Sequence, residues 1–181
     1  MNSSAQAAQQ DRIESGADLL RRAVAGDRDA LASIVDAHHS DMLRVSFVVC
    51  GDRETAREAV QSAWLRAATR LGSIHDHARL RAWLCSVAAN EARMALRRRR
   101  PTLPIEALDG HPAEARALSV DLIDLAIALN GLTPADRELL ALRYVAGFSS
   151  PELADHARMT PAGVRSRLKR LLDRLRKELD R

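Results

Sequence analysis

The sequence predicts an all-α protein made of two small helical domains joined by a flexible linker, with a helix-turn-helix in the C-terminal domain. Two observations favour helices. Only 3% of the 181 residues are aromatic, and glycine and proline contribute just eight and six residues. Apolar residues recur at spacings of three and four over most of the chain, which is the helical period. No run of Val, Ile and Thr alternates with polar residues between hairpin turns, so strands are not expected.

The N-terminal part of the chain begins without a pattern and then becomes helical. Residues 1–15 are small and polar and lack periodicity, so we expect a disordered tail. From Ala17 onward apolar residues recur at helical spacing, with breaks at residues 26–27 and 51–52, both Gly-Asp. The second aspartate, Asp52, is a residue type that accepts hydrogen bonds from the first amides of a helix.

Two longer helices are expected next. The first spans Arg53 to Leu71 and the second Arg79 to Arg100, and the loop GSIHDHA (residues 72–78) separates them. Trp64 and Trp83 lie on the apolar stripes of these two helices. We therefore expect both tryptophans to be core anchors rather than platforms on which bases stack.

A change in composition separates the two halves of the chain. Pro101 and Pro104 end the helical pattern, and residues 101–117 are predicted to form a linker. Five acids accompany one base between residues 101 and 130, whereas eight basic residues accompany one acid between residues 158 and 177. The net charge is +4 and the isoelectric point about 9.8. The segregated positive charge indicates a polyanionic partner.

The C-terminal half contains a helix expected from about Leu118 to Leu129 and then three helices with clear start signals. The last two have the spacing of a helix-turn-helix, and Ala154 is small enough for the point where they touch. Arg158 falls in their turn, at a position where a left-handed backbone favours glycine. Each start places a capping residue one or two positions before a proline in the first turn: Thr133 before Pro134, Ser149 or Ser150 before Pro151, and Thr160 before Pro161.

The last helix is predicted to be a recognition helix. The second helix of such a pair enters the major groove with its N-terminal residues near base edges. Arg165, Ser166 and Lys169 are the candidates for reading bases, and Arg167, Arg170 and Arg174 are those for binding phosphates. The pattern alone is also compatible with a solvated amphipathic helix that binds no DNA. The predicted DNA-binding set is Thr160, Pro161, Ala162, Arg165, Ser166, Arg167, Lys169 and Arg170.

Several other classes of protein are disfavoured by the sequence. No phosphate-binding glycine loop, metal-ligand cluster or activated nucleophile is visible, so we expect no enzyme activity, no cofactor and no metal site.

Cys50 and Cys85 lie in apolar helical patterns and are expected to be buried thiols rather than a disulfide. The N-terminus lacks an apolar signal core and no stretch is long enough to span a membrane. A cytoplasmic protein without membrane insertion is therefore expected.

The two halves together resemble regions 2 and 4 of the extracytoplasmic-function (ECF) sigma factors of bacterial RNA polymerase, within the sigma-70 superfamily. The resemblance covers about residues 17–100 and 118–180. It implies a region 2-like domain at 16–100 and a region 4-like domain at 118–181, on either side of the linker. The matching tracts are GDRETAREAVQSAWLRAATRL and RLRAWLCSVAANEARMALRRRR in the first half and GLTPADRELLALRYVAGFSSPELADHARMTPAGVRSRLKRLLDRLRKEL in the second.

The resemblance implies an alternative sigma factor that binds the polymerase core and directs promoter-specific transcription initiation. Its expected partners are the clamp helices and flap of the core, promoter DNA and an anti-sigma factor. The residues implied in core binding are Asp52, Glu58, Gln61 and Arg66. Those implied in binding the minus-ten element are Ile74, His75, Asp76, His77, Asn90, Arg93 and Arg97, and the recognition helix would read the minus-thirty-five element.

The chain departs from the family pattern at two places. The tract Thr55-Ala56-Arg57-Glu58 stands where the family usually has Asp-Ala-Glu-Asp, so Arg57 inverts one charge on the core-binding helix. Ala162-Gly163 stands where Gly-Thr is frequent.

The alternative function is a one-component helix-turn-helix regulator with an N-terminal sensor domain. The scarcity of aromatic residues does not favour the ligand pocket that such a sensor needs.

Overall fold

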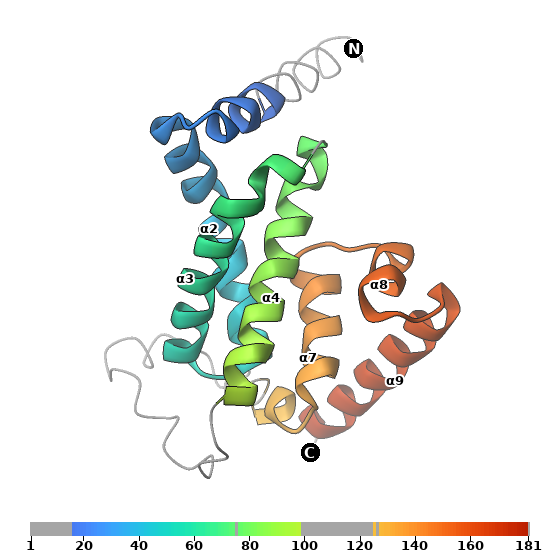
Figure 1. The fold of residues 1–181 in the computed structure, drawn as a ribbon. Helices are drawn as coiled ribbons and strands as arrows, with labels where there is room; N and C mark the ends of the chain where they lie inside the picture. Colours follow the sequence, from blue (N-terminus) through green and yellow to red (C-terminus); the bar gives the residue numbers. More distant parts are fainter. Residues whose placement is uncertain (1–15, 75, 99–124, 126, 181) are drawn as a thin grey trace, which may run out of the picture.

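The computed structural model describes residues 16–74, 76–98, 125 and 127–180, and all regular structure in these ranges is helical, as predicted (Figure 1). The predicted tail and linker lie outside these ranges. Short helical segments occupy residues 16–24 and 127–130. The other elements are α2 (Arg28–Cys50), α3 (Arg53–Arg70), η1 (Leu71–Ser73), η2 (His77–Arg79), α4 (Leu80–Arg98), α7 (Pro134–Leu140), η3 (Ala141–Val145), α8 (Ser150–Ala157) and α9 (Pro161–Leu179).

The breaks expected at the two Gly-Asp pairs are where α2 begins and ends. Asp27 caps α2 by accepting hydrogen bonds from the backbone amides of Asp29 and Ala30 at 3.0 and 3.1 Å. At the other end Gly51 adopts a left-handed backbone with φ of 72°, which costs glycine little. Asp52 then caps α3 by accepting from the Thr55 amide at 2.8 Å.

Helices α2, α3 and α4 pack against one another as a three-helix unit. Trp64 and Trp83 are partly buried and pack against its core, so the prediction that they anchor the core is confirmed. The core, here called the N-terminal cluster, consists of Leu20, Ile34, Met42, Val60, Ala63, Ala67, Leu71, Leu80, Leu84 and Ala88.

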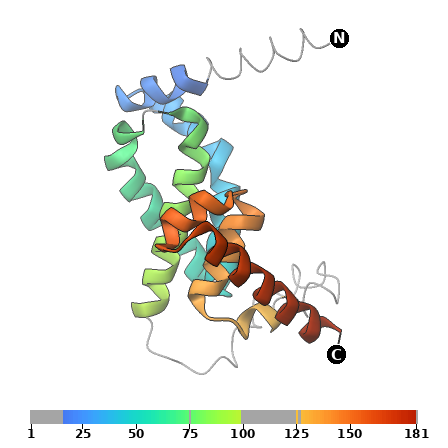
Figure 2. The ribbon, with the colours of Figure 1, turned by 90° about the vertical axis from the view of Figure 1, so that its right-hand side faces the viewer.

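A second apolar cluster joins the two halves of the chain, which the sequence pattern did not predict. It combines Val49, Cys85 and Ala89 of the three-helix unit with Leu142 and Leu153 from the C-terminal helices, among other residues. Figures 1 and 2 show α7 alongside α4, with α8 and α9 further out. The two predicted helical units are therefore packed together, and α4 contributes to both clusters.

The C-terminal helices begin at the predicted caps. The side chains of Thr133, Ser149 and Thr160 accept hydrogen bonds from backbone amides in the first turns of α7, α8 and α9. Helix α7 continues into η3, a π-helical turn in which the amide of Ala146 bonds the carbonyl of Ala141 at 3.1 Å. Ala154 of α8 is buried and α8 packs against α9, as expected for a helix-turn-helix.

The turn between α8 and α9 has the backbone conformation predicted for it. Arg158 has φ of 54° and ψ of 47°, and among the described residues it is the one non-glycine with positive φ. A side chain in this left-handed region costs about 1–2 kcal/mol. Its amide hydrogen bonds the carbonyl of Ala154, which ends α8.

Replacing Arg158 by glycine should therefore stabilise the chain by about 0.5–1 kcal/mol, since relief of the left-handed strain exceeds the entropy that glycine adds to the unfolded chain. Urea unfolding followed by circular dichroism measures the change. Gly147→Ala is the control, because Gly147 has φ of 81° and alanine there should destabilise. A loss of stability in Arg158→Gly would show that the arginine side chain contributes more than the strain costs.

Candidate nucleic-acid interface

Helix α9 presents a buried apolar face and an exposed polar face. Val164, Leu168, Leu171 and Leu175 are buried against the rest of the C-terminal helices. On other sides of the helix Arg165, Ser166 and Lys169 are exposed. These three are the side chains that the sequence assigned to base edges, and they are accessible in the structure. Exposed polar groups at the start of a recognition helix are suited to hydrogen bonding in a major groove.

The first residues of the predicted set form the start of α9. The hydroxyl of Thr160 accepts a hydrogen bond from the amide of Gly163 at 3.1 Å, and Pro161 occupies the first turn. Ala162 is exposed and small. This end of the helix is therefore fixed by its own cap and leaves room for another molecule to approach the backbone.

One flank of α9 faces α7 and holds part of the predicted phosphate-binding set. The Nε of Arg167 lies 2.8 Å from a carboxylate oxygen of Asp136, so Arg167 links α9 to α7. Arg174 donates to the carbonyl of Gly131 at 2.9 Å. Arg170 is exposed on the same flank, and a shallow pocket of about 270 Å³ lies among these residues.

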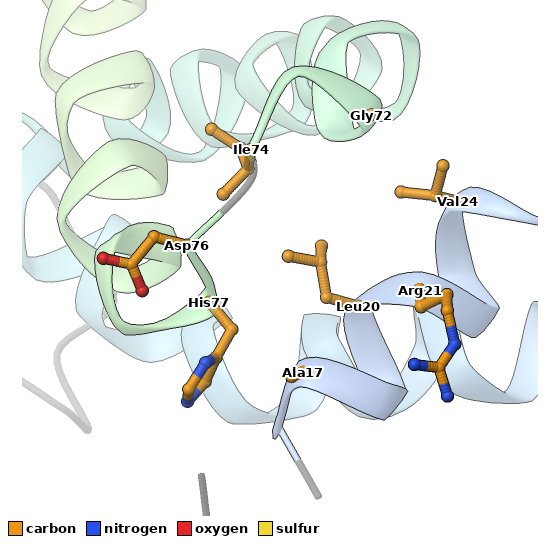
Figure 3. Close-up of a pocket in the computed structure, with 8 residues that line it drawn as sticks. All are labelled: Ala17, Leu20, Arg21, Val24, Gly72, Ile74, Asp76 and His77. Carbon is orange, nitrogen blue, oxygen red and sulfur yellow. The ribbon is translucent and has the colours of Figure 1, made fainter. Parts of the chain in front are cut away.

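The loop between α3 and α4 forms an open pocket with the helix of residues 16–24 (Figure 3). Leu20 and Val24 project towards Ile74 across it, and Asp76 and His77 lie along its edge. The pocket volume is about 480 Å³. From the sequence, Ile74, Asp76 and His77 were predicted to bind the minus-ten element, but the helix of residues 16–24 was not included, although its apolar stripe is visible there. His75, also predicted, lies outside the described residues.

The remaining minus-ten candidates lie elsewhere on α4. Arg93 is thirteen residues beyond the start of the helix at Leu80, a rise of about 20 Å. Its guanidinium donates to the side-chain oxygen of Asn90 at 3.0 Å and to Glu138 of α7 at 2.9 Å. Arg97 is exposed. The structure thus divides the predicted minus-ten residues into a loop group and an α4 group.

The α4 group is part of a polar cluster between the two halves, here called the Glu138 cluster and formed by Arg93, Glu138 and His156. Only 4% of the Glu138 side chain is exposed. One of its oxygens bonds Arg93, and the other lies 2.8 Å from Nε2 of His156. Two basic side chains from α4 and α8 therefore meet on one buried carboxylate of α7, as a buried charge requires.

A second polar contact joins the two halves at the C-terminal end of the π-helical turn. Arg81 of α4 donates to the carbonyls of Ala146 and Val145 at 2.6 and 3.0 Å. Its Nε lies 2.7 Å from Asp41 of α2. The π-helical turn leaves these carbonyls at the end of the helix without continuing intrahelical partners, and Arg81 satisfies them.

The outward face of α3 contains the candidates for polymerase binding. Glu58 and Gln61 are exposed. Asp52 instead caps the helix, and the Nε of Arg66 lies 2.7 Å from Glu91 of α4, whose side chain is 3% exposed. Arg57 lies 3.6 Å from Glu54 on the same helix, so the inverted charge has a local partner.

Both cysteines are buried thiols, as expected from the sequence. Neither Cys50 nor Cys85 forms a disulfide and both are buried, and burial raises the pKa of the Cys85 thiol to about 11, which leaves it protonated at neutral pH. Within the described ranges no group of three or more His, Cys, Asp or Glu side chains could hold a metal ion. No described helix is long and apolar enough to cross a membrane.

Comparison with known protein families finds a family match in each half of the chain. Residues 34–102 match the model of sigma-70 region 2, and residues 123–175 match that of sigma-70 region 4. The two matches follow the order expected from the sequence.

Individual relatives extend over most of the chain. The ECF RNA polymerase sigma factor SigM of Mycobacterium tuberculosis (strain Erdman) is 33% identical over 171 residues, which cover 87% of this chain and 85% of SigM. The probable RNA polymerase sigma factor RfaY of Xanthomonas campestris is 34% identical over 88% of this chain, but the matched part is 43% of RfaY. The structure of the sigma factor RpoE of Bartonella quintana, solved with the anti-sigma factor NepR, has 26% identity and a TM-score of 0.66 over 84% of this chain and 96% of RpoE.

Removing the charge of Glu138 should loosen the packing between the halves. We expect Glu138→Gln to lower the free energy of unfolding by about 1–3 kcal/mol, because Arg93 and His156 lose the charged acceptor on which they meet. Urea denaturation at constant pH measures this change.

The matched control is Glu54→Gln, since the pair of Glu54 with Arg57 is exposed on one helix. Its effect should stay below about 0.5 kcal/mol. Equal effects for the two variants would contradict a role for the Glu138 cluster in joining the halves.

Proposed function

Because the chain belongs to the extracytoplasmic-function RNA polymerase sigma factors, we propose that it binds the core of bacterial RNA polymerase and directs initiation at specific promoters. The observation that supports this most is the presence of a region 2 match and a region 4 match, in that order, on one chain. Sigma factors are initiation factors rather than enzymes. We propose that this one acts in the cytoplasm with the polymerase.

The geometry supports a division of labour between the two halves. In this proposal the outward face of α3 contacts the clamp helices of the core through Glu58 and Gln61. The loop pocket binds an unstacked base of the minus-ten element, because an apolar cleft with polar edges suits a base removed from its stack. Helix α9 reads the minus-thirty-five element through its exposed residues, while Arg170 binds phosphate.

The packing of the two halves occupies part of one proposed DNA contact, Arg93. Asn90 and Arg93, proposed to contact the minus-ten strand, are hydrogen bonded to each other, and Arg93 also bonds Glu138. One part of the Arg93 guanidinium is therefore held by the C-terminal half, while 42% of the side chain stays exposed. An anti-sigma partner is proposed by analogy with RpoE, whose structure contains one.

Run-off transcription tests the proposed function directly. Purified core polymerase is incubated with genomic promoter fragments, with and without this chain. We expect discrete transcripts that depend on adding the chain, and their start sites define the two promoter elements. Absence of both core binding and initiation, together with specific DNA binding by the chain alone, would favour the one-component regulator instead.

Substitutions in α9 separate base reading from phosphate binding. Lys169→Ala or Arg165→Ala should weaken holoenzyme binding to a cognate promoter by about 1–3 kcal/mol and change the preferred sequence at one position. The measurement is affinity for a panel of promoters with single substitutions in the minus-thirty-five element, at fixed salt.

An equal loss on every promoter would identify a phosphate contact rather than a base contact. Asp173→Ala serves as a control, because Asp173 is exposed further along α9 and pairs only with Arg176 among the described residues.

A further inference from the structure

A buried arginine lies where the end of α2 meets α7. Arg137 of α7 is only 7% exposed. Its guanidinium donates to the side-chain oxygen of Asn130 at 2.8 Å, and its Nε is buried without a hydrogen-bond partner. Among the described residues no carboxylate pairs with it, although a buried charge normally has a partner of opposite sign. The arrangement therefore leaves a buried positive charge that another group can neutralise.

Cys50, the last residue of α2, is the ionisable group beside this arginine. Burial lowers the pKa of Arg137, and the charge of Cys50 raises it, so the two groups act on each other. A Cβ placed on the next residue, Gly51, would lie 3.0 Å from a guanidinium nitrogen of Arg137, which puts the arginine directly against the end of α2. A neighbouring arginine favours the thiolate form of a cysteine, and the thiolate is the reactive form.

The other charged groups around Cys50 have partners elsewhere. The carboxylate of Asp52, the acid nearest in the chain, accepts from an amide in the first turn of α3. On α4, the Sγ of Cys50 lies 3.8 Å from the carbonyl oxygen of Ala92. The charged residues on either side of Ala92 form ion pairs with other side chains, Glu91 with Arg66 and Arg93 with Glu138. Of these charges, Arg137 is the one that lies against the end of α2 without a carboxylate of its own.

Cys85 provides an internal comparison within the same chain. It lies within α4, is 1% exposed, and burial raises its pKa to about 11. Cys50 is 7% exposed and lies at a helix end, next to the half-buried Gly51 and Asp52. A small oxidant therefore has a shorter path to Cys50 than to Cys85.

We propose that Cys50 is a peroxide-sensitive thiol and that Arg137 is the positioning residue that stabilises its thiolate. The thiol proton passes to solvent. The thiolate sulfur then attacks one oxygen of hydrogen peroxide, so that an S–O bond forms and the O–O bond breaks. Sulfur gives two electrons to the peroxide, the product is a sulfenic acid, and the other oxygen leaves as hydroxide. This inference does not depend on the proposed sigma function.

The oxidised group would lie in the contact between the two halves. Cys50 belongs to the apolar cluster that the three-helix unit shares with the C-terminal helices. An added oxygen in a closely packed cluster displaces its neighbours. Oxidation at Cys50 is thus placed where it acts on the packing of the halves.

Rates of thiol labelling in the full chain test the proposal. The chain is treated with hydrogen peroxide in the presence of dimedone, which traps sulfenic acids, and peptide mass spectrometry reports Cys50 and Cys85 separately. We expect Cys50 to be labelled at least about 10-fold faster than Cys85. Alkylation by iodoacetamide over a range of pH should give a rate midpoint for Cys50 below the ordinary thiol value of about 8.5.

Substitutions at Arg137 identify the arginine as the cause. Arg137→Met should lower the labelling rate of Cys50 at neutral pH about 5- to 10-fold and move its midpoint to higher pH, because the thiolate loses the adjacent cation. Arg137→Lys should keep most of the rate, since it keeps the charge. Arg143→Met is the matched control, because Arg143 follows on the same helical run but bonds the carbonyl of Phe148, and its effect should stay within about twofold.

The original chain alone can overturn the proposal, so the test does not depend on whether Arg137→Met folds. Equal labelling of Cys50 and Cys85, or a midpoint for Cys50 at or above about 8.5, would identify Cys50 as an ordinary buried thiol. Unchanged labelling of Cys50 in a folded Arg137→Met chain would remove the arginine from the proposal. Cys85 reports folding, because unfolding exposes it and raises its rate, and Cys50→Ala should abolish the fast labelling.

Discussion

The small side chains of α4 determine how the rest of the molecule packs. Ala88 faces the N-terminal cluster, while Cys85, Ala89 and Ala92 face the cluster shared with the C-terminal helices, and all four are almost fully buried. Helices can approach closely only where no large side chain separates them. One helix therefore supports two cores at once, and a bulky residue at any of these positions would push apart either the three-helix unit or the two halves.

The apolar contacts between the halves are supplemented by charged groups whose geometry is specific. A carboxylate with 4% exposure, Glu138, is acceptable only because Arg93 and His156 meet it. Arg81 similarly satisfies two carbonyls that the π-helical turn leaves free. Such contacts favour one relative placement of the halves, whereas an apolar surface alone tolerates several. Arg93 of α4 thus contributes to the packing of the two halves through its bond with Glu138.

Local features were predictable because neighbouring residues determine them. The caps at Asp52 and Thr160, the buried Ala154 and the left-handed Arg158 all follow from residue types within a few positions. The packing of the halves was not predictable, because Glu138 lies 45 residues from Arg93 and no local pattern relates them.

Contacts between distant parts of the chain were also not predictable within the candidate sites. Periodicity identified which side of α9 is exposed, but it did not show that Arg167 and Arg66 are held by acids on neighbouring helices. It also did not reveal that the helix of residues 16–24 completes the loop pocket. The outward face of α3 lies away from the C-terminal helices, while Arg93 of α4 bonds Glu138 of the C-terminal half. Under the proposed function, contact of α3 with the polymerase therefore does not depend on separation of the two halves, and the factor can join the core in its packed form.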